Sequence, residues 1–312
     1  MNRRDFLGVA ATALTSAAVP SRPRAAAGPE VAVTMDDFNV LDDVRLPAVE
    51  RSARILEALK SHGARAAGLV IGRFAATPQA DAVLDAWAES GHTIGNHTYS
   101  HPDYHAPSIS SQEFEEDFSR ADATLRTRKG FTRLFRFPML HGGDTAEKRD
   151  AMRTALERRG YREAHVTIDT GDWLIDRELR ARLAAHAKAD TRPYRDLYLR
   201  HMRAVVRYYR EAAQQVFGRD IPHTLLTHFN LISAFHLGDL LQALKSDGWS
   251  IIAAADAYRD PVFRRSPTVL PAGDSLVWTC AREAGTTLPK APIENERWLT
   301  AELEALKRRG RL

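Results

Sequence analysis

The chain has 312 residues, of which 44% are apolar and 27% are charged, and its mean hydropathy is −0.36. These values are typical of an ordinary globular domain and exclude a disordered or collagen-like chain. Because Cys280 is the only cysteine, the sequence also excludes an intrachain disulfide and a metal site built from cysteines. The formal net charge of +4 would favour nucleic-acid binding only if the basic residues gathered on one face.

The first 27 residues have the pattern of a signal peptide. A basic start is followed by an apolar run over residues 6–19 and by the small residues Ala25-Ala26-Ala27. Phe6-Leu7 after the paired Arg3 and Arg4 resembles the twin-arginine type, whose export machinery is then an expected partner of the precursor. The apolar run is too short for a stable membrane span. We therefore expect residues 1–27 to be removed and the protein to be exported, periplasmic or secreted.

The same segment accounts for most of the basic charge. It holds four arginines and one aspartate, a net +3, so the remaining chain carries 4 − 3 = +1. We therefore expect no nucleic-acid partner. The basic residues near the C-terminus are interpreted as the solvated end of a helix.

Short apolar strands and amphipathic helices alternate from residue 30 onward. Helices are predicted over residues 47–62 and 80–90, from the capping box Ser110–Glu113, and from Asp144 to the stop signal at Gly160. The predicted strands cover residues 31–35, 66–71, 92–96, 134–137, 164–168, 224–227 and 249–253.

This alternation predicts an α/β fold with a parallel sheet. About seven strand–helix units fit a distorted (β/α) barrel that is closed or nearly closed, with a doubly wound open sheet as the alternative. Residues 174–218 exceed one crossover and are interpreted as a helical insertion. Residues 28–312 are thus predicted to form one catalytic domain.

Polar side chains follow five of the predicted strands. Parallel strands of a barrel open on one face, so these side chains are expected to converge although they are far apart in the sequence. The residues are Asp36 and Asp37, His97 and His101, Arg136, Asp169 with Asp172 and Trp173, and Leu226 with His228.

Each of these signals also has a purely structural interpretation. Paired aspartates often cap turns, Arg136 could serve only as an ion-pair partner, and His228 could be a buried, hydrogen-bonded histidine. A His-x-x-x-His pair suits a metal but is equally compatible with two solvated side chains. The conjunction of five motifs in this order favours a catalytic site.

Together the motifs resemble those of the polysaccharide deacetylase family, carbohydrate esterase family four. The resemblance covers residues 31–257 and implies a distorted barrel, a divalent metal and hydrolysis of an N- or O-acetyl group on a glycan. The implied metal is usually zinc, although histidine and carboxylate ligands also accept cobalt, nickel or manganese.

The resemblance also implies a role for each residue. Asp37, His97 and His101 would bind the metal. Asp36 would be the general base, oriented by Arg136, and His228 the general acid, held by Asp172. The backbone around Phe137 and Pro138 would help bind the substrate oxyanion, while Trp173 and Leu226 would wall the acetyl pocket. No role follows for Asp169 or His141.

Two segments depart from the family pattern, and both are expected on loops that shape the groove. Phe38-Asn39 stands where the family has Gly-Pro, and Met139-Leu140-His141 precedes Gly142 after the arginine motif. Because of these changes, the motifs do not determine which glycan is the substrate.

Sequence features disfavour several other classes of function. The sequence has no Gly-x-Ser-x-Gly and no glycine-rich phosphate loop, which disfavours serine hydrolases and nucleotide enzymes. An amide or imide hydrolase acting on a small nitrogen compound could use the same scaffold, but expected export disfavours it. A carbohydrate-binding barrel without turnover is the remaining alternative, and the full set of ligands, base and acid counts against it.

Overall fold

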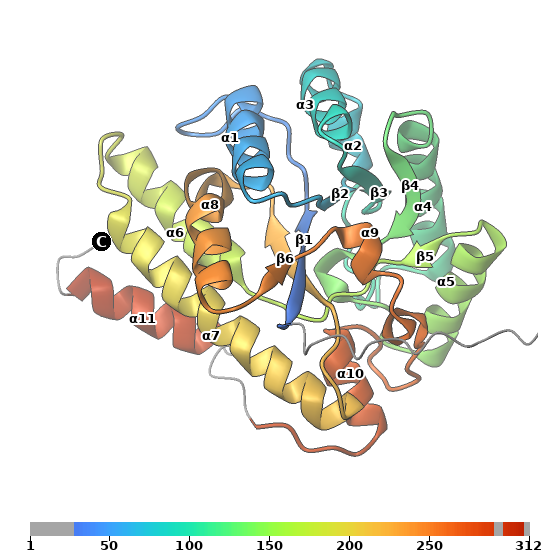
Figure 1. The fold of residues 1–312 in the computed structure, drawn as a ribbon. Coiled ribbons are helices and arrows are strands. Elements are labelled where there is room, and N and C mark those ends of the chain that lie inside the picture. Colours follow the sequence, from blue (N-terminus) through green and yellow to red (C-terminus); the bar gives the residue numbers. More distant parts are fainter. Residues whose placement is uncertain (1–27, 290–295, 309–312) are drawn as a thin grey trace, which may run out of the picture.

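Seven parallel strands form the centre of the molecule (Figure 1). The computed structural model describes residues 28–289 and 296–308, so the predicted signal peptide lies outside the described residues. The strand order is β5-β4-β3-β2-β1-β6, and β7 pairs with β1. The strands are β1 (Glu30–Asp36), β2 (Ala67–Val70), β3 (Thr93–Asn96), β4 (Phe131–Phe135), β5 (Arg162–Glu163), β6 (His223–His228) and β7 (Ser250–Ile251).

Helices surround this sheet on its outer side (Figure 1). They are α1 (Ala48–Ser61), α2 (Gly72–Ala75), α3 (Pro78–Glu89), α4 (Ser111–Leu125), α5 (Ala146–Arg158), α6 (Asp172–Ala185), α7 (Arg192–Phe217), α8 (Leu231–Ser246), α9 (Ala254–Ala257), α10 (Leu276–Glu283) and α11 (Glu296–Arg308). The result is a curled, incomplete (β/α) barrel, which confirms the predicted fold class.

Strand β1 is a central strand of the barrel and pairs with β2, β6 and β7. Val31, Ala32, Val33 and Met35 are fully buried, as expected for an apolar strand with neighbours on both edges and helices outside. Its whole length pairs with β6, and this register places Asp36 beside His228. Two predicted site residues separated by 192 positions therefore become neighbours through backbone pairing.

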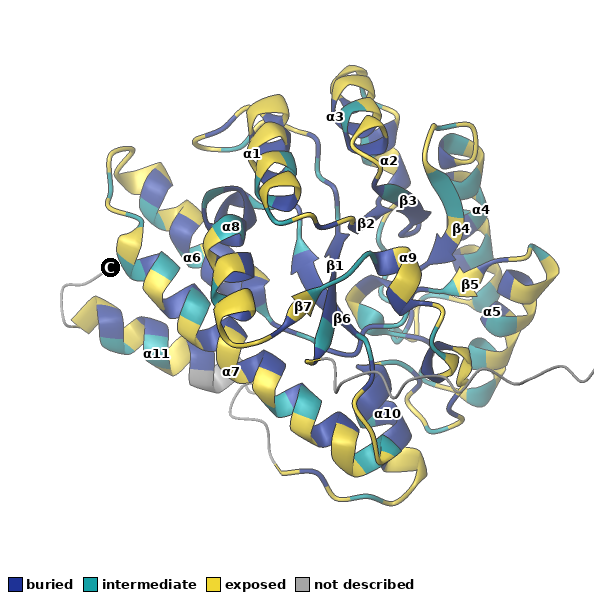
Figure 2. Cartoon of the chain, viewed as in Figure 1, coloured by how far each residue is buried: buried dark blue, intermediate teal, exposed yellow. Residues whose placement is uncertain are grey.

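Along the helices, buried residues alternate with exposed ones, as expected for helices that cover a sheet on one side (Figure 2). In α4, Phe114 and Phe118 are fully buried, and the helix begins at the predicted capping box between Ser110 and Glu113. In α5 the N-cap is Thr145 rather than Asp144, because the Thr145 hydroxyl accepts from the Lys148 amide. The predicted start is thus one residue early.

The predicted strand over residues 164–168 is wrong. Only Arg162 and Glu163 pair with β4, after which the chain crosses toward β6, where Ile168 makes a single bridge to Leu225. Threonine side chains add to a few backbone hydrogen bonds here, since the Thr167 and Thr224 amides each donate to the other residue's hydroxyl. Side-chain hydrogen bonds of this kind compete with regular strand pairing.

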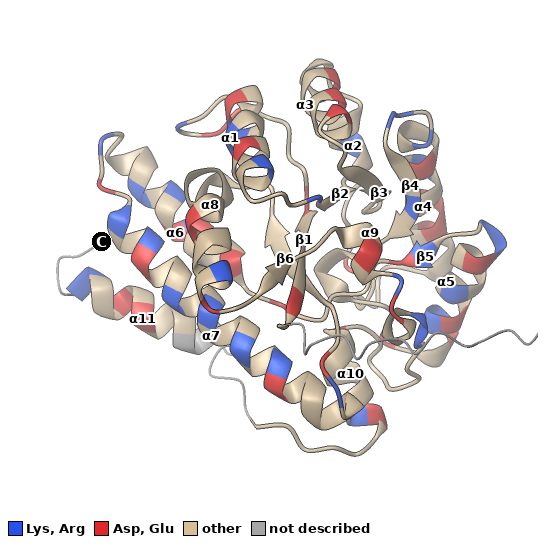
Figure 3. Cartoon of the chain, viewed as in Figure 1, with Lys and Arg blue, Asp and Glu red and all other residues tan. Residues whose placement is uncertain are grey.

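The predicted helical insertion is present as α6 and α7. Helix α11 packs against α6, where Lys307 lies 2.7 Å from Glu178. In the part of the chain that the structure describes, no helix has the length and apolarity needed to cross a membrane. Acidic and basic side chains are mixed along the outer helices in the view of Figure 3.

Candidate active site

The predicted site residues lie where strands end on one face of the barrel. Asp36 and His228 are the last residues of β1 and β6, while His97 and Arg136 directly follow β3 and β4. Asp172 is the first residue of α6. These five positions come together because the strands are parallel, as predicted from the sequence.

Three side chains are arranged as metal ligands would be. Asp37 Oδ1 lies 3.6 Å from His97 Nε2 and 3.4 Å from His101 Nε2. One ligand atom from each residue lies within 4.8 Å of the other two. The His97 Nδ1 atom is 2.9 Å from the Arg136 carbonyl, an outer contact that leaves Nε2 directed toward the other two ligand atoms. Two imidazoles and one carboxylate therefore fit a divalent ion with open coordination positions.

The backbone around these ligands adopts unusual conformations. Asp37, Thr98 and His101 have φ values of 72°, 62° and 64°, in the left-handed region that non-glycine residues rarely occupy. Hydrogen bonds fix the loop, since the Asn96 carboxamide oxygen accepts from the Thr98 amide and the Thr98 hydroxyl accepts from the His101 amide. Such conformations persist only where their surroundings hold them and often mark functional sites.

The electrostatics of this group favour the ionisation states that bind metals. Burial, and then the neighbouring His97, lowers the pKa of His101 to about 4, which keeps its imidazole neutral. Burial alone would raise the pKa of Asp37, but its hydrogen bond with His97 and the nearby histidines hold it well below its usual range. A neutral imidazole and an ionised carboxylate are the forms that coordinate a cation.

Asp36 belongs to a buried ion pair rather than to this group. Its Oδ1 accepts from Arg136 Nη1 at 2.5 Å, and the two side chains are 5% and 1% exposed. The guanidinium also donates to the Ala164 carbonyl, the Thr34 hydroxyl and the Tyr258 hydroxyl. Arg136 is thus fixed at several points and positions one oxygen of Asp36.

His228, which is partly buried, is paired with the fully buried Asp172. Its Nδ1 lies 2.6 Å from Asp172 Oδ1, and its backbone amide donates to Asp172 Oδ2. Burial opposes the charge on His228, but the adjacent Asp172 carboxylate outweighs it and raises the pKa of His228 to about 10. The imidazole is therefore a protonated group whose Nε2–H is free of the Asp172 contact.

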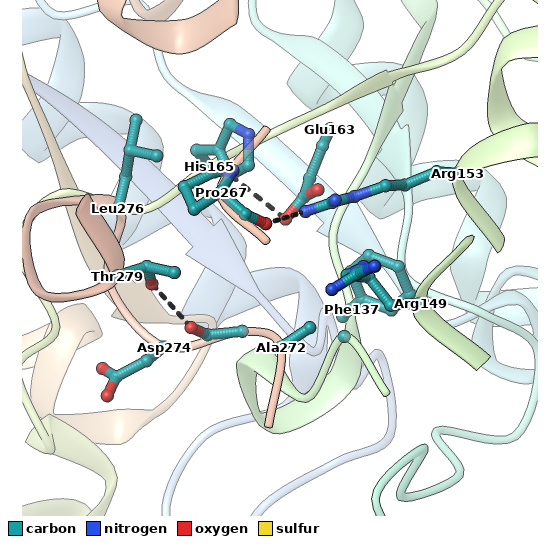
Figure 4. A pocket seen from close by; sticks show the side chains of 12 residues that line it. Phe137, Arg149, Arg153, Glu163, His165, Pro267, Ala272, Asp274, Leu276 and Thr279 are labelled. Carbon is teal, nitrogen blue, oxygen red and sulfur yellow. Dashed lines mark hydrogen bonds and ion pairs between the residues drawn. The ribbon is translucent and has the colours of Figure 1, made fainter. Parts of the chain in front are cut away.

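Asp36, His228 and the three ligand residues line one cavity of about 610 Å³. Trp173 and Leu226, the predicted walls of the acetyl pocket, line it as well. Phe137 and Pro138 are buried and do not appear on its wall. Figure 4 shows the Phe137 side chain at a different pocket of about 20 Å³, room for only one or two waters. A role for the Phe137 backbone stays a prediction.

Asp169 and His141, for which no role is predicted, also line the 610 Å³ cavity. Burial, and then the nearby Asp274, raises the pKa of Asp169 to about 6. The His141 Nδ1 atom lies 2.6 Å from Asp103 Oδ1, and its ring stacks on His105 with centroids 3.9 Å apart.

The two departures from the family pattern have different consequences. Met139 and Leu140 line the cavity, as expected. Phe38 does not, because its fully buried ring packs against Trp87 and stacks on Phe229 with centroids 4.4 Å apart. Phe38 itself anchors the loop that carries Asp37, whereas its neighbour Asn39 lines an adjoining cavity that shares Asp37, Trp173 and His228 with this one.

Sequence reasoning missed Thr34 and Tyr258, which hold the Arg136 guanidinium. Thr34 is an inward-facing residue of β1, and Tyr258 directly follows the short helix α9. Neither residue stands in a motif, so only the fold reveals that they contact Arg136.

Comparison with known proteins gives three kinds of match. A family model described as polysaccharide deacetylase matches residues 24–164. Peptidoglycan-N-acetylglucosamine deacetylase from Bacillus cereus is 29% identical over 144 residues, which are 46% of this chain and 46% of that protein. Chitooligosaccharide deacetylase from Azorhizobium caulinodans is 30% identical over 138 residues, 44% of this chain and 60% of that protein. The chain thus spans less than two thirds of the length of either relative.

A solved structure resembles the fold over a longer range. The crystal structure of a mutant CE4 family pseudoenzyme with restored enzymatic activity has a TM-score of 0.51 and 19% sequence identity. The match covers 74% of this chain and 67% of that one. At this identity the likeness supports the fold alone.

Proposed function

We propose that this chain, whose family-model match and curated relatives support its assignment to the polysaccharide deacetylase family, is a metal-dependent hydrolase that removes N- or O-acetyl groups from a glycan. The observation that carries the proposal is that three ligand residues line one cavity together with Asp36, which Arg136 holds, and His228, which Asp172 holds. The ligand triad is Asp37, His97 and His101.

The proposed metal fits the residues that would hold it. Asp37, His97 and His101 supply one carboxylate and two imidazole ligand atoms, a set that suits zinc and also accepts cobalt, nickel or manganese. When bound, such an ion supplies a Lewis acid that polarises the acetyl carbonyl and acidifies the attacking water.

Asp36 is the proposed general base. Arg136 holds its Oδ1, and its Oδ2 lies 3.8 Å from His97 Nε2, close to the ligand triad. A carboxylate in this place can take the proton of the attacking water while Arg136 keeps it oriented. Thr34 and Tyr258 act one step further out, as positioning residues for the guanidinium.

His228 is the proposed general acid. An amine leaves a tetrahedral intermediate poorly unless its nitrogen is protonated, and the Asp172-paired imidazolium holds a proton on Nε2 for that transfer. Asp172 is a positioning residue that fixes the ring through Nδ1. Trp173 and Leu226 would flank the methyl group of the acetyl, and the backbone at Phe137 and Pro138 would contribute to oxyanion binding.

The proposed substrate lies outside the cytoplasm. The signal-peptide pattern over residues 1–27 favours export by the twin-arginine machinery, and the matched relatives are named for peptidoglycan and chitooligosaccharide deacetylation. We therefore propose a cell-envelope or extracellular acetylated glycan as the substrate, and residues 28–312 as the catalytic domain.

The direct test is acetate release from acetylated glycans. Chelator-treated protein is assayed on peptidoglycan, chitooligosaccharides and acetylated xylan, with and without added Zn²⁺, Co²⁺, Ni²⁺ or Mn²⁺. We expect acetate only after metal addition, loss of at least ~10²-fold in His228→Ala, and full activity in His186→Ala, an exposed histidine at the end of α6. The mechanism is contradicted if the rate of acetate release is the same with and without metal and the same in His228→Ala as in the wild type. Turnover of small amides or imides alone identifies the alternative hydrolase, and glycan binding without acetate identifies a non-catalytic protein.

A further inference from the structure

The cavity loop, residues 139–143, forms one wall of the catalytic cavity in a costly conformation. Met139, Leu140 and His141 all line the cavity. Met139 and Leu140 have φ values of 53° and 58°, so two consecutive non-glycine residues occupy the left-handed region. Such a conformation persists only where the surrounding structure holds it. The segment that lies against the cavity loop is the strap, residues 267–274.

The strap holds the cavity loop through a short antiparallel ladder of backbone hydrogen bonds. The Gly142 amide donates to the Ala272 carbonyl, and the Ala272 amide donates to the Gly143 carbonyl, both at 2.8 Å. The Asp274 amide donates to the Leu140 carbonyl at 3.0 Å. One of the two left-handed residues is therefore fixed directly by the strap.

Only glycine fits the strap where it passes closest to the cavity loop. Gly273 has a φ of 122°, and a Cβ added there would stand 1.9 Å from the Leu140 carbonyl oxygen. Because the obstructing atom belongs to the backbone, no side-chain rotation could relieve the clash. Gly273 also faces His141 in the ladder. A side chain at position 273 would therefore displace the cavity loop or the strap.

The strap is itself anchored by side chains of two helices, α5 and α10. On α5, Arg153 donates to the Pro267 carbonyl at 2.5 Å, and on α10 the Thr279 hydroxyl donates to the Gly273 carbonyl at 2.7 Å. Dashed lines mark both contacts in Figure 4. The strap and α10 lie beyond residues 24–164, so the family-model match includes neither of them.

We propose that the strap positions the cavity loop for the chemical step, with Gly273 as its main positioning residue. The loop continues the turn that contains the proposed oxyanion-binding backbone, since the Leu140 amide donates to the Phe137 carbonyl and the His141 amide to the Pro138 carbonyl. A shift of about 1 Å in such a group can cost ~10²-fold in rate. The inference rests on the proposed function and adds a dependence of its rate on a segment outside the catalytic motifs.

Two glycine variants test this dependence. Gly285 is the matched control, because its φ of 64° is also positive but no atom of the described residues lies within 4 Å of a Cβ added there. Both Gly273→Ala and Gly285→Ala therefore strain the backbone, and only Gly273→Ala collides with the cavity loop. In Zn²⁺-loaded protein we expect Gly273→Ala to lower kcat for N-deacetylation at least ~tenfold and Gly285→Ala to change it less than about twofold. Equal losses in both variants, or no loss in Gly273→Ala, overturn the proposal.

Metal binding distinguishes a displaced loop from a damaged ligand triad. The three metal ligands lie outside the cavity loop, so Gly273→Ala should still bind one equivalent of Zn²⁺ with an affinity close to that of the wild type. Loss of the metal from Gly273→Ala would overturn the proposal, because the fall in kcat would then arise at the ligands.

A milder pair of variants covers the case in which Gly273→Ala does not fold. Thr279→Val removes the hydroxyl that donates to the Gly273 carbonyl while keeping the branched shape of the side chain, and Thr279→Ser restores that hydroxyl. We expect kcat to fall severalfold in Thr279→Val and to recover to within about twofold of the wild type in Thr279→Ser. Equal kcat in the two variants overturns the positioning role of the strap.

Amide hydrogen exchange tests the hold on the cavity loop without turnover. The Gly142 and Asp274 amides, both donors in the ladder, should exchange at least ~tenfold faster in Gly273→Ala than in the wild type, while the amides of β1 and those of Gly285→Ala stay unchanged. That result without acetate release from any glycan by the wild type would leave the strap standing and contradict the deacetylase. Acetate release by the wild type, with exchange and kcat unchanged in Gly273→Ala, would leave the deacetylase standing and contradict the strap.

Discussion

Replacing Asp172 by Asn tests the origin of the charge on His228. The carboxylate is fully buried and lies 2.6 Å from the His228 Nδ1 atom, and it is the largest influence that raises the pKa of His228 from 6.5 to about 10. Asn has nearly the same shape but no charge, so burial should then dominate and bring the pKa to 6.5 or below. At pH 8 the protonated fraction of His228 should fall from ~99% to ~3%, about thirtyfold.

The direction of the stability change follows from the same pair. Because the pKa of His228 in the folded state lies above its ordinary value, the pair contributes stability that is fully present below pH 6.5. This contribution is lost as the pH rises toward 10. In Asp172→Asn the contribution is absent, so the wild type should be the more stable protein below pH 6.5 and lose that advantage through this window.

Two measurements check this reasoning. The imidazole proton resonances of His228 in metal-free protein, followed by NMR from pH 5 to pH 10.5, should titrate near 10 in the wild type and below 6.5 in the variant. The metal-loaded variant should also lose about thirtyfold in N-deacetylation at pH 8 and much less on a phenyl acetate ester, whose leaving group needs no proton. The same pKa for His228 in both proteins would refute the argument that Asp172 maintains its charge.

Three further predictions concern the other site residues and the N-terminus. Asp37→Asn should weaken metal affinity and regain some activity in excess metal, whereas Asp36→Asn should keep the affinity and lose catalytic rate; the opposite pattern would reverse their roles. Arg136→Leu should lower the free energy of unfolding in urea by about 3–5 kcal/mol because it leaves the Asp36 carboxylate buried and unpaired. Adding Asp36→Leu should recover part of that loss, and a loss under 1 kcal/mol for Arg136→Leu alone would contradict the ion pair's role. Changing Arg3 and Arg4 to lysine should keep the precursor in the cytoplasm, and unchanged export would contradict a twin-arginine signal.

The sequence predicts the parallel barrel because strand and helix periodicities alternate clearly. It also predicts that the strand-end residues converge, since parallel strands leave only one face on which they can meet. Asp36 and His228 confirm this, because one continuous register between β1 and β6 sets them side by side.

Features that depend on side chains meeting across the fold were not predictable. The apolar pattern over residues 164–168 is that of a strand, but the hydroxyls of Thr167 and Thr224 compete with the backbone for the amide hydrogen bonds, and a regular ladder does not form. Phe38 follows the aspartate pair on a loop that borders the groove, but nothing in the sequence shows that its ring packs between Trp87 and Phe229. Tyr258 contacts Arg136 across 122 residues without any local signal.

The central claim is that one divalent ion, held by Asp37, His97 and His101, is required for deacetylation. The most direct measurement titrates Zn²⁺ into chelator-treated protein and records acetate release from a chitooligosaccharide at each ratio of metal to protein. We predict a linear rise that stops at one equivalent, and no rise in His101→Ala over the same range. Acetate release without metal, or an unchanged titration in His101→Ala, would contradict the claim.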